Sequence, residues 1–215
     1  MKKISSILLI ILLVLPFSTL AQQDDPVKAT LDRIFVDKDF SNEKFGPARW
    51  LEDGSGYTTL EKSETVKKAK DIIRYNPKNG KREVMVSASL LIPKGHETAL
   101  DIENYSWSPK NNMLLIFTNG KKVWRTNTRG DYYILNMKTK ELRQLGPEFP
   151  PSTLMFAKVS PDEKKAGYVV KNNIYVEDLA TGNIKQLTSD GSKTIINGTF
   201  DWVYEEEFSC RDGFR

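Results

Sequence analysis

A strand and turn pattern that occurs more than once along the chain constrains the fold more than any other feature of the sequence. The segments 133–145 and 175–187 each begin with tyrosine, contain a polar turn and close on Gln-Leu. A fainter copy runs from Ile73 to Met85 around an Asn-Gly pair. Short runs rich in Val, Ile, Tyr and Thr, separated by polar turn residues, are typical of antiparallel hairpins. The sequence therefore predicts an all-β fold with a repeated hairpin.

A second repeated element precedes two of these hairpins. A Ser-Pro pair in segment 107–110 stands before the apolar segment 113–117, and another in segment 159–162 stands before segment 166–170. Proline fixes the backbone angle that a tight turn between strands requires. Two hairpins then make one four-stranded unit of roughly 40 to 50 residues, as in a β-propeller blade. A β-sandwich has no reason to repeat the same turn chemistry, so we expect an incomplete β-propeller of about three to four blades.

The beginning of the chain differs from the rest. Residues 1–21 combine a basic start at Lys2 and Lys3, an apolar run over residues 7–15 and a small-residue exit at Ala21. This pattern is typical of a secretory signal peptide, which we expect to be cleaved after Ala21. The apolar run is short for a membrane span, so anchoring by an uncleaved leader is the less favoured alternative. The sequence predicts export to the periplasm or the extracellular space.

Residues 22–44 are predicted to form a short N-terminal helical segment, and residues 45–215 the partial propeller. Asp25 can cap the first free amides of a helix, and Pro26 suits its first turn. Four apolar side chains then share one face of a helix that we expect to end near Phe40, and they are Val27, Leu31, Ile34 and Phe35. That apolar face is expected to need a partner.

Composition and missing motifs exclude several functions. The chain has 32 basic and 28 acidic residues and a formal net charge of +4, too small an excess to predict nucleic-acid binding. Cys210 is the only cysteine, which excludes an internal disulfide, and we expect it to be a small buried hydrophobic residue. With His96 as the only histidine, expected in an exposed loop, the usual zinc sites are excluded. No Gly-x-Ser-x-Gly elbow or Gly-rich phosphate loop occurs, so we predict no catalytic residue, metal or cofactor.

Two segments could carry a binding function. Residues 201–208 place three consecutive glutamates between aromatic side chains, which is either a solvated acidic turn or a set of carboxylates that binds a cation. Residues 121–130 make one blade about ten residues longer than the next. We expect this insertion to lie in a loop, where functional residues concentrate.

These two segments carry a resemblance to a known family. The sequence from Asp201 to Glu207 resembles the double-glutamate motif of the dipeptidyl peptidase IV family, and Trp124-Arg125 resembles the substrate arginine of that family. The Ser-Pro turns and the segments 172–175 and 196–198 also match. The resemblance implies an eight-bladed propeller that caps an α/β-hydrolase domain and an enzyme that removes dipeptides from peptide N-termini, with proline or alanine second. The hydrolase domain with its Ser, Asp and His is absent from this sequence, so we interpret the chain as a fragment.

The resemblance also implies roles for individual residues. Glu206 and Glu207 would bind the α-ammonium group of the substrate, and Arg125 would reach the carbonyl oxygen of the residue nearer the scissile bond. Glu205 would shape the acidic segment. Trp124 is a supporting candidate for which a packing role and a contact role are about equally favoured.

Two aromatic residues of the acidic segment are expected to support the site from below. Tyr204, a supporting candidate, and Trp202 are predicted to pack beneath the acidic turn rather than to contact substrate.

We therefore interpret the chain as the substrate-recognition propeller portion of an exported serine dipeptidyl peptidase. Its predicted partners are peptide N-termini, its own hydrolase domain in the full-length protein and a second copy in a homodimer. The alternatives are a non-catalytic β-propeller binding module and an inactive family member.

Overall fold

The computed structural model describes residues 25–41, 46–123 and 125–214. The chain divides into two units, residues 1–44 and residues 45–215. The predicted signal peptide, residues 1–21, lies outside the described residues. Among the described residues, no helix is both long and apolar enough to cross a membrane.

The first unit contains helix α2 (Pro26–Phe35). It begins as the sequence predicts, because the Asp25 side chain accepts a 2.9 Å hydrogen bond from the amide of Val27 and proline occupies the first turn. The helix ends at Phe35, before the expected Phe40. None of its residues is buried, so its apolar side chains face solvent.

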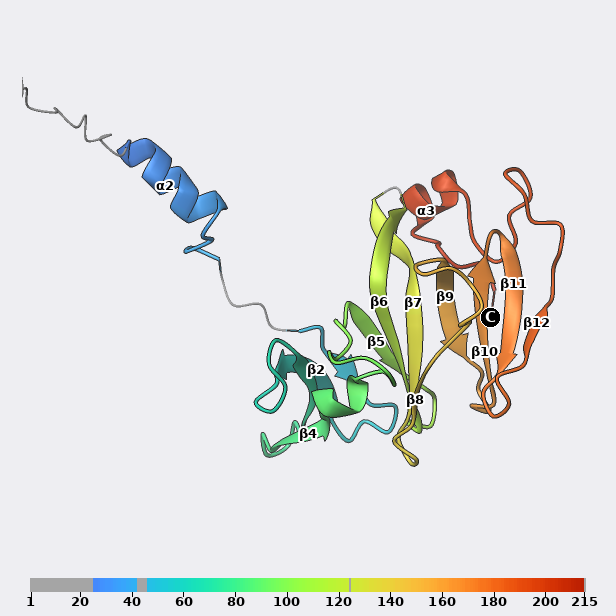
Figure 1. Cartoon of the computed structure of the whole chain (residues 1–215), viewed down its shortest axis with the longest axis horizontal. Coiled ribbons are helices and arrows are strands. Elements are labelled where there is room, and N and C mark those ends of the chain that lie inside the picture. The colour runs from blue at the N-terminus through green and yellow to red at the C-terminus, as the bar shows by residue number, and fades with distance from the viewer. Residues whose placement is uncertain (1–24, 42–45, 124, 215) are drawn as a thin grey trace, which may run out of the picture. The chain divides into compact units, whose positions relative to one another are not determined.

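The described part of the second unit consists of three antiparallel four-stranded meanders, coloured from teal to orange in Figure 1. Blade 1 contains β1 (Arg49–Trp50), β2 (Tyr57–Lys62), β3 (Lys70–Tyr75) and β4 (Arg82–Val86). Blade 2 contains β5 (Asn104–Trp107), β6 (Met113–Val123), β7 (Thr126–Asn136) and β8 (Leu142–Gln144). Blade 3 contains β9 (Leu154–Val159), β10 (Lys165–Val170), β11 (Asn173–Asp178) and β12 (Ile184–Gln186). A 3₁₀ helix (Ala88–Leu91) follows β4, and helix α3 (Trp202–Phe208) follows blade 3.

This arrangement confirms the prediction of an incomplete all-β propeller. Blade 1 is a separate sheet, whereas blades 2 and 3 join into one sheet because β9 pairs with β7. The joining pairs are Arg129 with Met155 and Gly130 with Leu154. They lie in the first half of β7, whose second half pairs with β8.

The turn between the third and fourth strands has the same geometry in each blade. It opens with a residue whose side-chain oxygen accepts a hydrogen bond from the amide two residues later, and these residues are Asn76, Asn136 and Asp178. Four residues further on, the backbone has a positive φ of 68°, 61° and 76° at Gly80, Lys140 and Gly182. The repeated hairpin of the sequence is therefore a repeated hydrogen-bonded turn.

The turn between the first and second strands is also repeated, and in all three blades. Its fourth residue has a positive φ of 65°, 56° and 63° at Gly54, Asn111 and Glu163. The amide of each donates to the carbonyl three residues earlier, at 2.9 Å, 2.8 Å and 2.9 Å. The sequence pattern revealed only the two Ser-Pro copies, because the turn of blade 1 begins with leucine and contains no proline.

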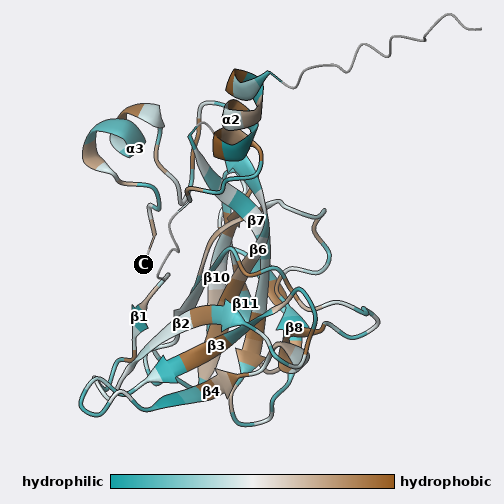
Figure 2. Ribbon diagram, turned by 90° about the vertical axis from the view of Figure 1, so that its left-hand side faces the viewer, coloured by the Kyte–Doolittle hydropathy of each residue, from teal (hydrophilic) through white to brown (hydrophobic). Residues whose placement is uncertain are grey.

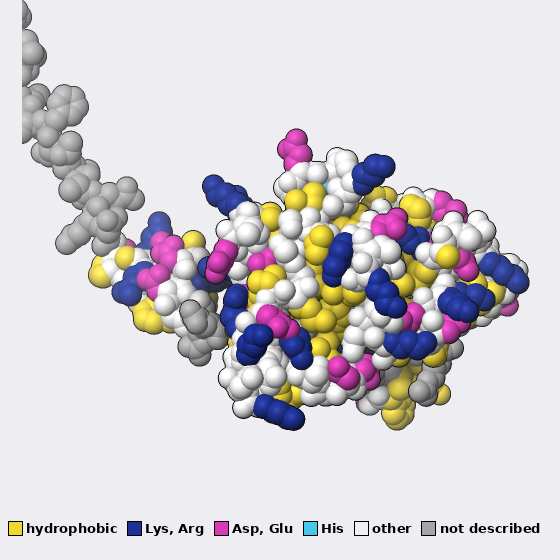
Figure 3. Space-filling view, turned by 90° about the horizontal axis from the view of Figure 1, so that it is seen from below, with side chains coloured by type: hydrophobic (Ala, Val, Ile, Leu, Met, Phe, Trp, Pro, Cys, Tyr) yellow, Lys and Arg dark blue, Asp and Glu magenta, His cyan; other side chains and the backbone are white. Residues whose placement is uncertain are grey.

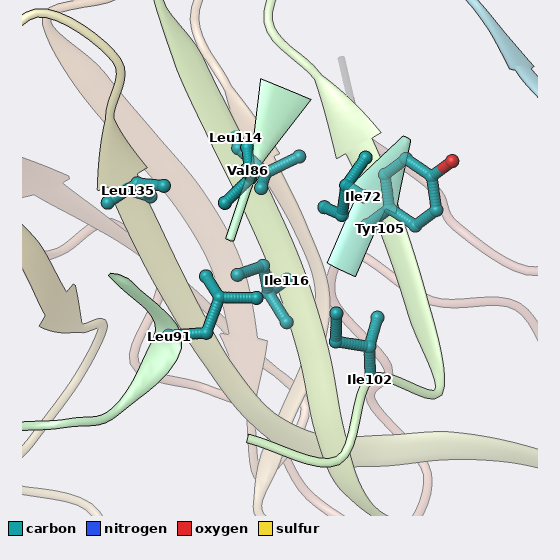
Figure 4. Packing of buried hydrophobic residues seen from close by; sticks show 8 residues of the cluster. All are labelled: Ile72, Val86, Leu91, Ile102, Tyr105, Leu114, Ile116 and Leu135. Atoms are coloured by element: carbon teal, nitrogen blue, oxygen red, sulfur yellow. The ribbon is translucent and has the colours of Figure 1, made fainter. Parts of the chain in front are cut away.

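Apolar packing between the blades forms the core. One cluster fills the space between blades 1 and 2 (Figure 4), and its buried members are Ile72, Val86, Leu91, Ile102, Tyr105, Leu114, Ile116 and Leu135. A second cluster fills the space between blades 2 and 3. Successive residues of a strand point to opposite faces, so β6 places Leu114 and Ile116 in the first cluster and Leu115 in the second. Brown, apolar colouring in Figure 2 likewise runs along strands such as β3.

A buried carboxylate joins blades 2 and 3 at their repeated turns. Glu163, only 8% exposed, accepts hydrogen bonds from the Ser108 hydroxyl at 2.5 Å, the Lys110 amide at 2.9 Å and the Asn112 side chain at 2.7 Å. Burial alone would raise the pKa of Glu163, but these donors outweigh it and hold the pKa below its ordinary value of 4.5.

A second buried carboxylate links the same two blades. Glu177 is fully buried and accepts hydrogen bonds from Arg143 at 2.5 Å, from the Gly146 amide at 2.9 Å and from the Tyr168 hydroxyl at 3.1 Å. Burial and the Glu177 charge raise the pKa of Tyr168, so its hydroxyl stays protonated and donates. Every oxygen of this carboxylate therefore has a donor, as a buried charge requires.

The surface carries charges of both signs. In the view from below, Lys and Arg side chains alternate with Asp and Glu side chains around exposed apolar atoms (Figure 3). On blade 1 such charges pair, since Arg74 lies 2.6 Å from Glu83 and Arg82 lies 2.8 Å from Glu61. Neither sign dominates this view, in keeping with the small net charge of +4.

We expect Glu163→Gln to lower the free energy of unfolding by about 1–3 kcal/mol at neutral pH, because the substitution replaces a charged acceptor with a neutral amide. The folded-state pKa is lowered, so the stabilisation by Glu163 is complete above pH 4.5 and is lost as the pH falls through the folded-state pKa. Urea denaturation of both proteins between neutral pH and pH 3 measures this. A difference in stability that stays constant over that range would contradict the prediction, and Glu141→Gln on the exposed β7–β8 turn is the control.

Candidate functional site

The inserted segment 121–130 lies in strands, not in the loop that the sequence predicted. It lengthens β6 and β7 to 11 residues each, and their pairing continues to Val123 opposite Thr126, with register shifts near Lys121. Arg125 therefore lies in the turn at the tip of a long hairpin. Trp124, the other predicted residue of this tip, lies outside the described residues.

Polar contacts fix the base of this hairpin. The Asp131 carboxylate, 9% exposed, accepts hydrogen bonds from the Asn119 side chain at 2.7 Å and from the Ser152 amide at 2.6 Å. The Ser152 hydroxyl closes the ring by donating to the Asn119 carbonyl at 2.7 Å. At Gly130 the strands approach so closely that a Cβ atom would lie 2.7 Å from the Thr118 carbonyl oxygen. The hairpin is thus attached to the start of blade 3 below its tip.

The acidic motif forms helix α3 and not a turn. Asp201 caps the helix by accepting a 3.0 Å hydrogen bond from the Tyr204 amide. Ser209 ends it in a left-handed conformation with φ of 54°, and the Cys210 amide donates to the Tyr204 carbonyl at 3.1 Å. Teal and brown colouring of α3 in Figure 2 reflects its alternation of charged and aromatic residues.

Helical geometry separates the three consecutive glutamates. Successive side chains of an α-helix diverge by about 100° at the backbone, so the three carboxylates have different surroundings. The side chain of Glu205 is 9% exposed and contacts Thr126, whose hydroxyl donates to it at 3.1 Å. The side chain of Glu206 is 14% exposed and faces Arg125. Glu207 is exposed, and no ion pair involves it among the residues that the structure describes.

The structure brings Arg125 and Glu206 together across the hairpin tip and the helix. Their guanidinium nitrogen and carboxylate oxygen lie 2.8 Å apart, and the Arg125 side chain remains 75% exposed. Next to this pair, Arg211 approaches the Glu205 carboxylate at 3.7 Å. A guanidinium group that is 75% exposed and a carboxylate whose side chain is only 14% exposed therefore meet at the surface.

The aromatic residues of α3 do not pack beneath the acidic segment as predicted. Trp202 and Tyr204 are 48% and 49% exposed, whereas the Glu205 and Glu206 side chains of the same helix face the protein. The Tyr204 ring stacks on Phe200 at a centroid distance of 5.3 Å, so it does support the helix from one side. Cys210 is also partly exposed and not buried as expected. His96 is exposed, as predicted.

Two cavities adjoin this region. A cavity of about 440 Å³ has Val123 and Arg129 of the hairpin, Phe156 of β9 and Glu205 of α3 among its lining residues. A larger one of about 780 Å³ is lined by parts of β5, β6, β7 and β9 and by Arg211. Among the described residues, no cluster of three or more His, Cys, Asp or Glu side chains could hold a metal ion.

Comparison with known proteins decides the family. Residues 108–215, which contain strands β6 to β12 and α3, match the family described as the dipeptidyl peptidase IV (DPP IV) N-terminal region. The chain belongs to the dipeptidyl peptidase IV family. The resemblance of the sequence to this family is thereby confirmed.

Individual relatives agree with membership of the dipeptidyl peptidase IV family. A putative dipeptidyl aminopeptidase of Schizosaccharomyces pombe is 32% identical over 64% of this chain and 17% of its own length. A probable dipeptidyl-aminopeptidase B of Aspergillus oryzae is 34% identical over 48% of this chain and 12% of its own length.

A solved structure supports the same family. The crystal structure of Porphyromonas gingivalis dipeptidyl peptidase 4 is similar with a TM-score of 0.65 and 28% identity, over 77% of this chain and 22% of that one. The chain thus spans less than a quarter of each of these proteins.

Sequence reasoning missed two residues of the site of this family member. Thr126 and Arg211 both contact Glu205. Thr126 lies about 80 positions before Glu205 in the sequence, and Arg211 lies beyond the end of α3, so nothing in the residues around them marks them as its partners. The one available signal was the adjacency of Thr126 to Arg125, which could have indicated that Thr126 belongs to the site. Long-range pairs of this kind depend on how the hairpin and the helix meet.

We expect the Arg125–Glu206 pair to contribute less than about 1 kcal/mol to stability, because Arg125 is largely exposed. A double-mutant cycle of Arg125→Ala and Glu206→Gln, followed by urea denaturation, measures the coupling energy. Loss of folding in Arg125→Ala would instead assign Arg125 a packing role.

Proposed function

We propose that the hairpin tip and α3 bind the free N-terminus of a peptide substrate, with Glu206 and Glu207 on its ammonium group and Arg125 on a backbone carbonyl oxygen. The observation that carries this proposal is the 2.8 Å pair between the exposed Arg125 and the largely buried Glu206. It rests on family membership and on the chemistry of these residues.

The balance of charge favours a cationic ligand. Glu205 pairs with Arg211, and Glu206 pairs with Arg125, which leaves the Glu207 carboxylate without an ion-pair partner among the described residues. An α-ammonium group would supply the missing positive charge through charge-assisted hydrogen bonds. An acetylated N-terminus lacks that charge and adds bulk where the helix stands, so it would bind poorly.

The exposure of Arg125 gives it a second role. A guanidinium group has five N–H donors, and the pair with Glu206 uses only some of them. The remaining donors can reach a carbonyl oxygen of the bound peptide, which fixes the peptide at a second point. Two contacts separated along the peptide hold it in one register, and positioning of this kind lowers the entropic cost of a reaction.

We further propose that the complete protein is an exported serine dipeptidyl peptidase, in which this propeller portion selects N-termini and an α/β-hydrolase domain performs acyl transfer. The relatives named dipeptidyl aminopeptidases support this assignment. In the same proposal residues 1–21 are a cleaved signal peptide, residues 22–44 a helical segment and residues 45–215 the propeller portion. Peptide N-termini are the substrates, and a homodimer is the proposed assembly.

The test uses the protein expressed from its complete gene with Gly-Pro-p-nitroanilide and its N-acetylated form. We expect cleavage of the free-amine substrate only. Glu206→Gln and Glu207→Gln should each lower kcat/KM by about 30-fold to 1,000-fold, because each leaves the ammonium group poorly paired. Arg125→Ala should lower it as well, with unchanged circular dichroism.

Glu141→Gln is the matched control, since it removes an exposed carboxylate on the β7–β8 turn. Equal cleavage of both substrates, or wild-type kcat/KM in Glu206→Gln, would refute the binding of the ammonium group. If folded wild-type protein cleaves neither substrate, a non-catalytic binding propeller or an inactive family member becomes the better assignment.

A further inference from the structure

The hairpin tip and helix α3 are joined by two neighbouring contacts. Arg125 pairs with Glu206, and the next residue of the hairpin, Thr126, bonds to the preceding residue of the helix, Glu205. The first contact is open to solvent, because the Arg125 side chain is 75% exposed. In the second contact the Glu205 side chain is only 9% exposed. The two contacts therefore differ in whether a ligand can reach them.

The proposed function would disrupt the first contact. A peptide ammonium group on Glu206 competes with Arg125 for the same carboxylate, and a carbonyl oxygen on Arg125 draws that guanidinium group away. Without another link, α3 would then lose its connection to the hairpin at the moment of binding. The helix has only seven residues and its apolar side chains are about half exposed or more, so it depends on such links for its position.

We propose that Thr126 and Glu205 form a positioning latch that keeps Arg125 and Glu206 in register when a peptide replaces their direct ion pair. The inference rests on the proposed function. The hydroxyl of Thr126 donates to Oε1 of Glu205 at 3.1 Å, and Nε of Arg211 lies 3.7 Å from the same oxygen. Glu205 thus contributes to recognition without contact to the substrate.

The chemistry of the latch suits this task. A buried carboxylate needs donors, since an unpaired charge away from water is costly. Glu205 satisfies that need with one donor from the hairpin and one cation from the segment after α3, so its side chain holds both elements at once. Glu206 is adjacent in the helix, and its position relative to Arg125 is set by how firmly Glu205 is held.

The test is Thr126→Val in the complete protein, a substitution of similar shape that removes the hydroxyl donor. We expect KM for Gly-Pro-p-nitroanilide to rise about 5- to 20-fold with kcat within about twofold of wild type, because loss of register weakens binding of the ground state and transition state alike. Thr126→Ser, which keeps the hydroxyl, should restore a wild-type KM.

Thr181→Val is the matched control. The Thr181 hydroxyl also donates to a carboxylate, that of Asp178 at 3.0 Å, but at the tip of the β11–β12 hairpin. This variant should leave KM unchanged. Hydrogen exchange supplies a readout independent of turnover, and it should be faster over residues 200–212 in Thr126→Val and unchanged there in Thr181→Val.

The outcomes separate the latch from the proposed function. A wild-type KM and unaltered hydrogen exchange in Thr126→Val, together with a lowered kcat/KM in Glu206→Gln, would overturn the latch and leave the binding of the ammonium group intact. A wild-type kcat/KM in Glu206→Gln would overturn the proposed function and the positioning role with it. Failure of Thr126→Ser to restore KM would also overturn the latch.

Discussion

Burial of blade 2 on both faces is the constraint on which the rest of the described structure depends. Leu114 and Ile116 of β6 pack toward blade 1, and Leu115 between them packs toward blade 3. A fully buried aliphatic side chain contributes about 1.5–3 kcal/mol, so a strand with apolar residues on both faces stabilises only when it lies between two sheets. The blades therefore fold as a stack in which the middle one fixes its neighbours.

Buried carboxylates make this stack specific. Apolar packing tolerates small shifts between sheets, whereas the donors around Glu163 and Glu177 accept only one register of blade 3 on blade 2. That register also determines where the chain after blade 3 arrives. Helix α3 consequently meets the tip of the β6–β7 hairpin, although the two elements are distant in sequence.

The sequence predicted the repeated hairpins and the Ser-Pro turns well because local hydrogen bonds form them, as the tips at Asn136 and Asp178 illustrate. It was wrong about segment 121–130, whose extra length relative to the next blade indicated a loop but whose residues continue the pairing of β6 and β7. It was also wrong about the acidic turn, since the cap at Asp201 converts that segment into a helix. In each case pairing or capping with other residues decided a conformation that composition left open.

The sequence by itself determined the all-β class and the blade repeat through local periodicity, and its resemblance to a family motif marked Arg125, Glu206 and Glu207 as candidates. Only the tertiary structure decided that Arg125 meets Glu206, that Glu205 is buried against Thr126 and that Glu207 remains exposed. The physical reason is that contacts between a hairpin and a distant helix are set by the packing of the blades between them, and that packing leaves no signal in the spacing of the residues along the chain.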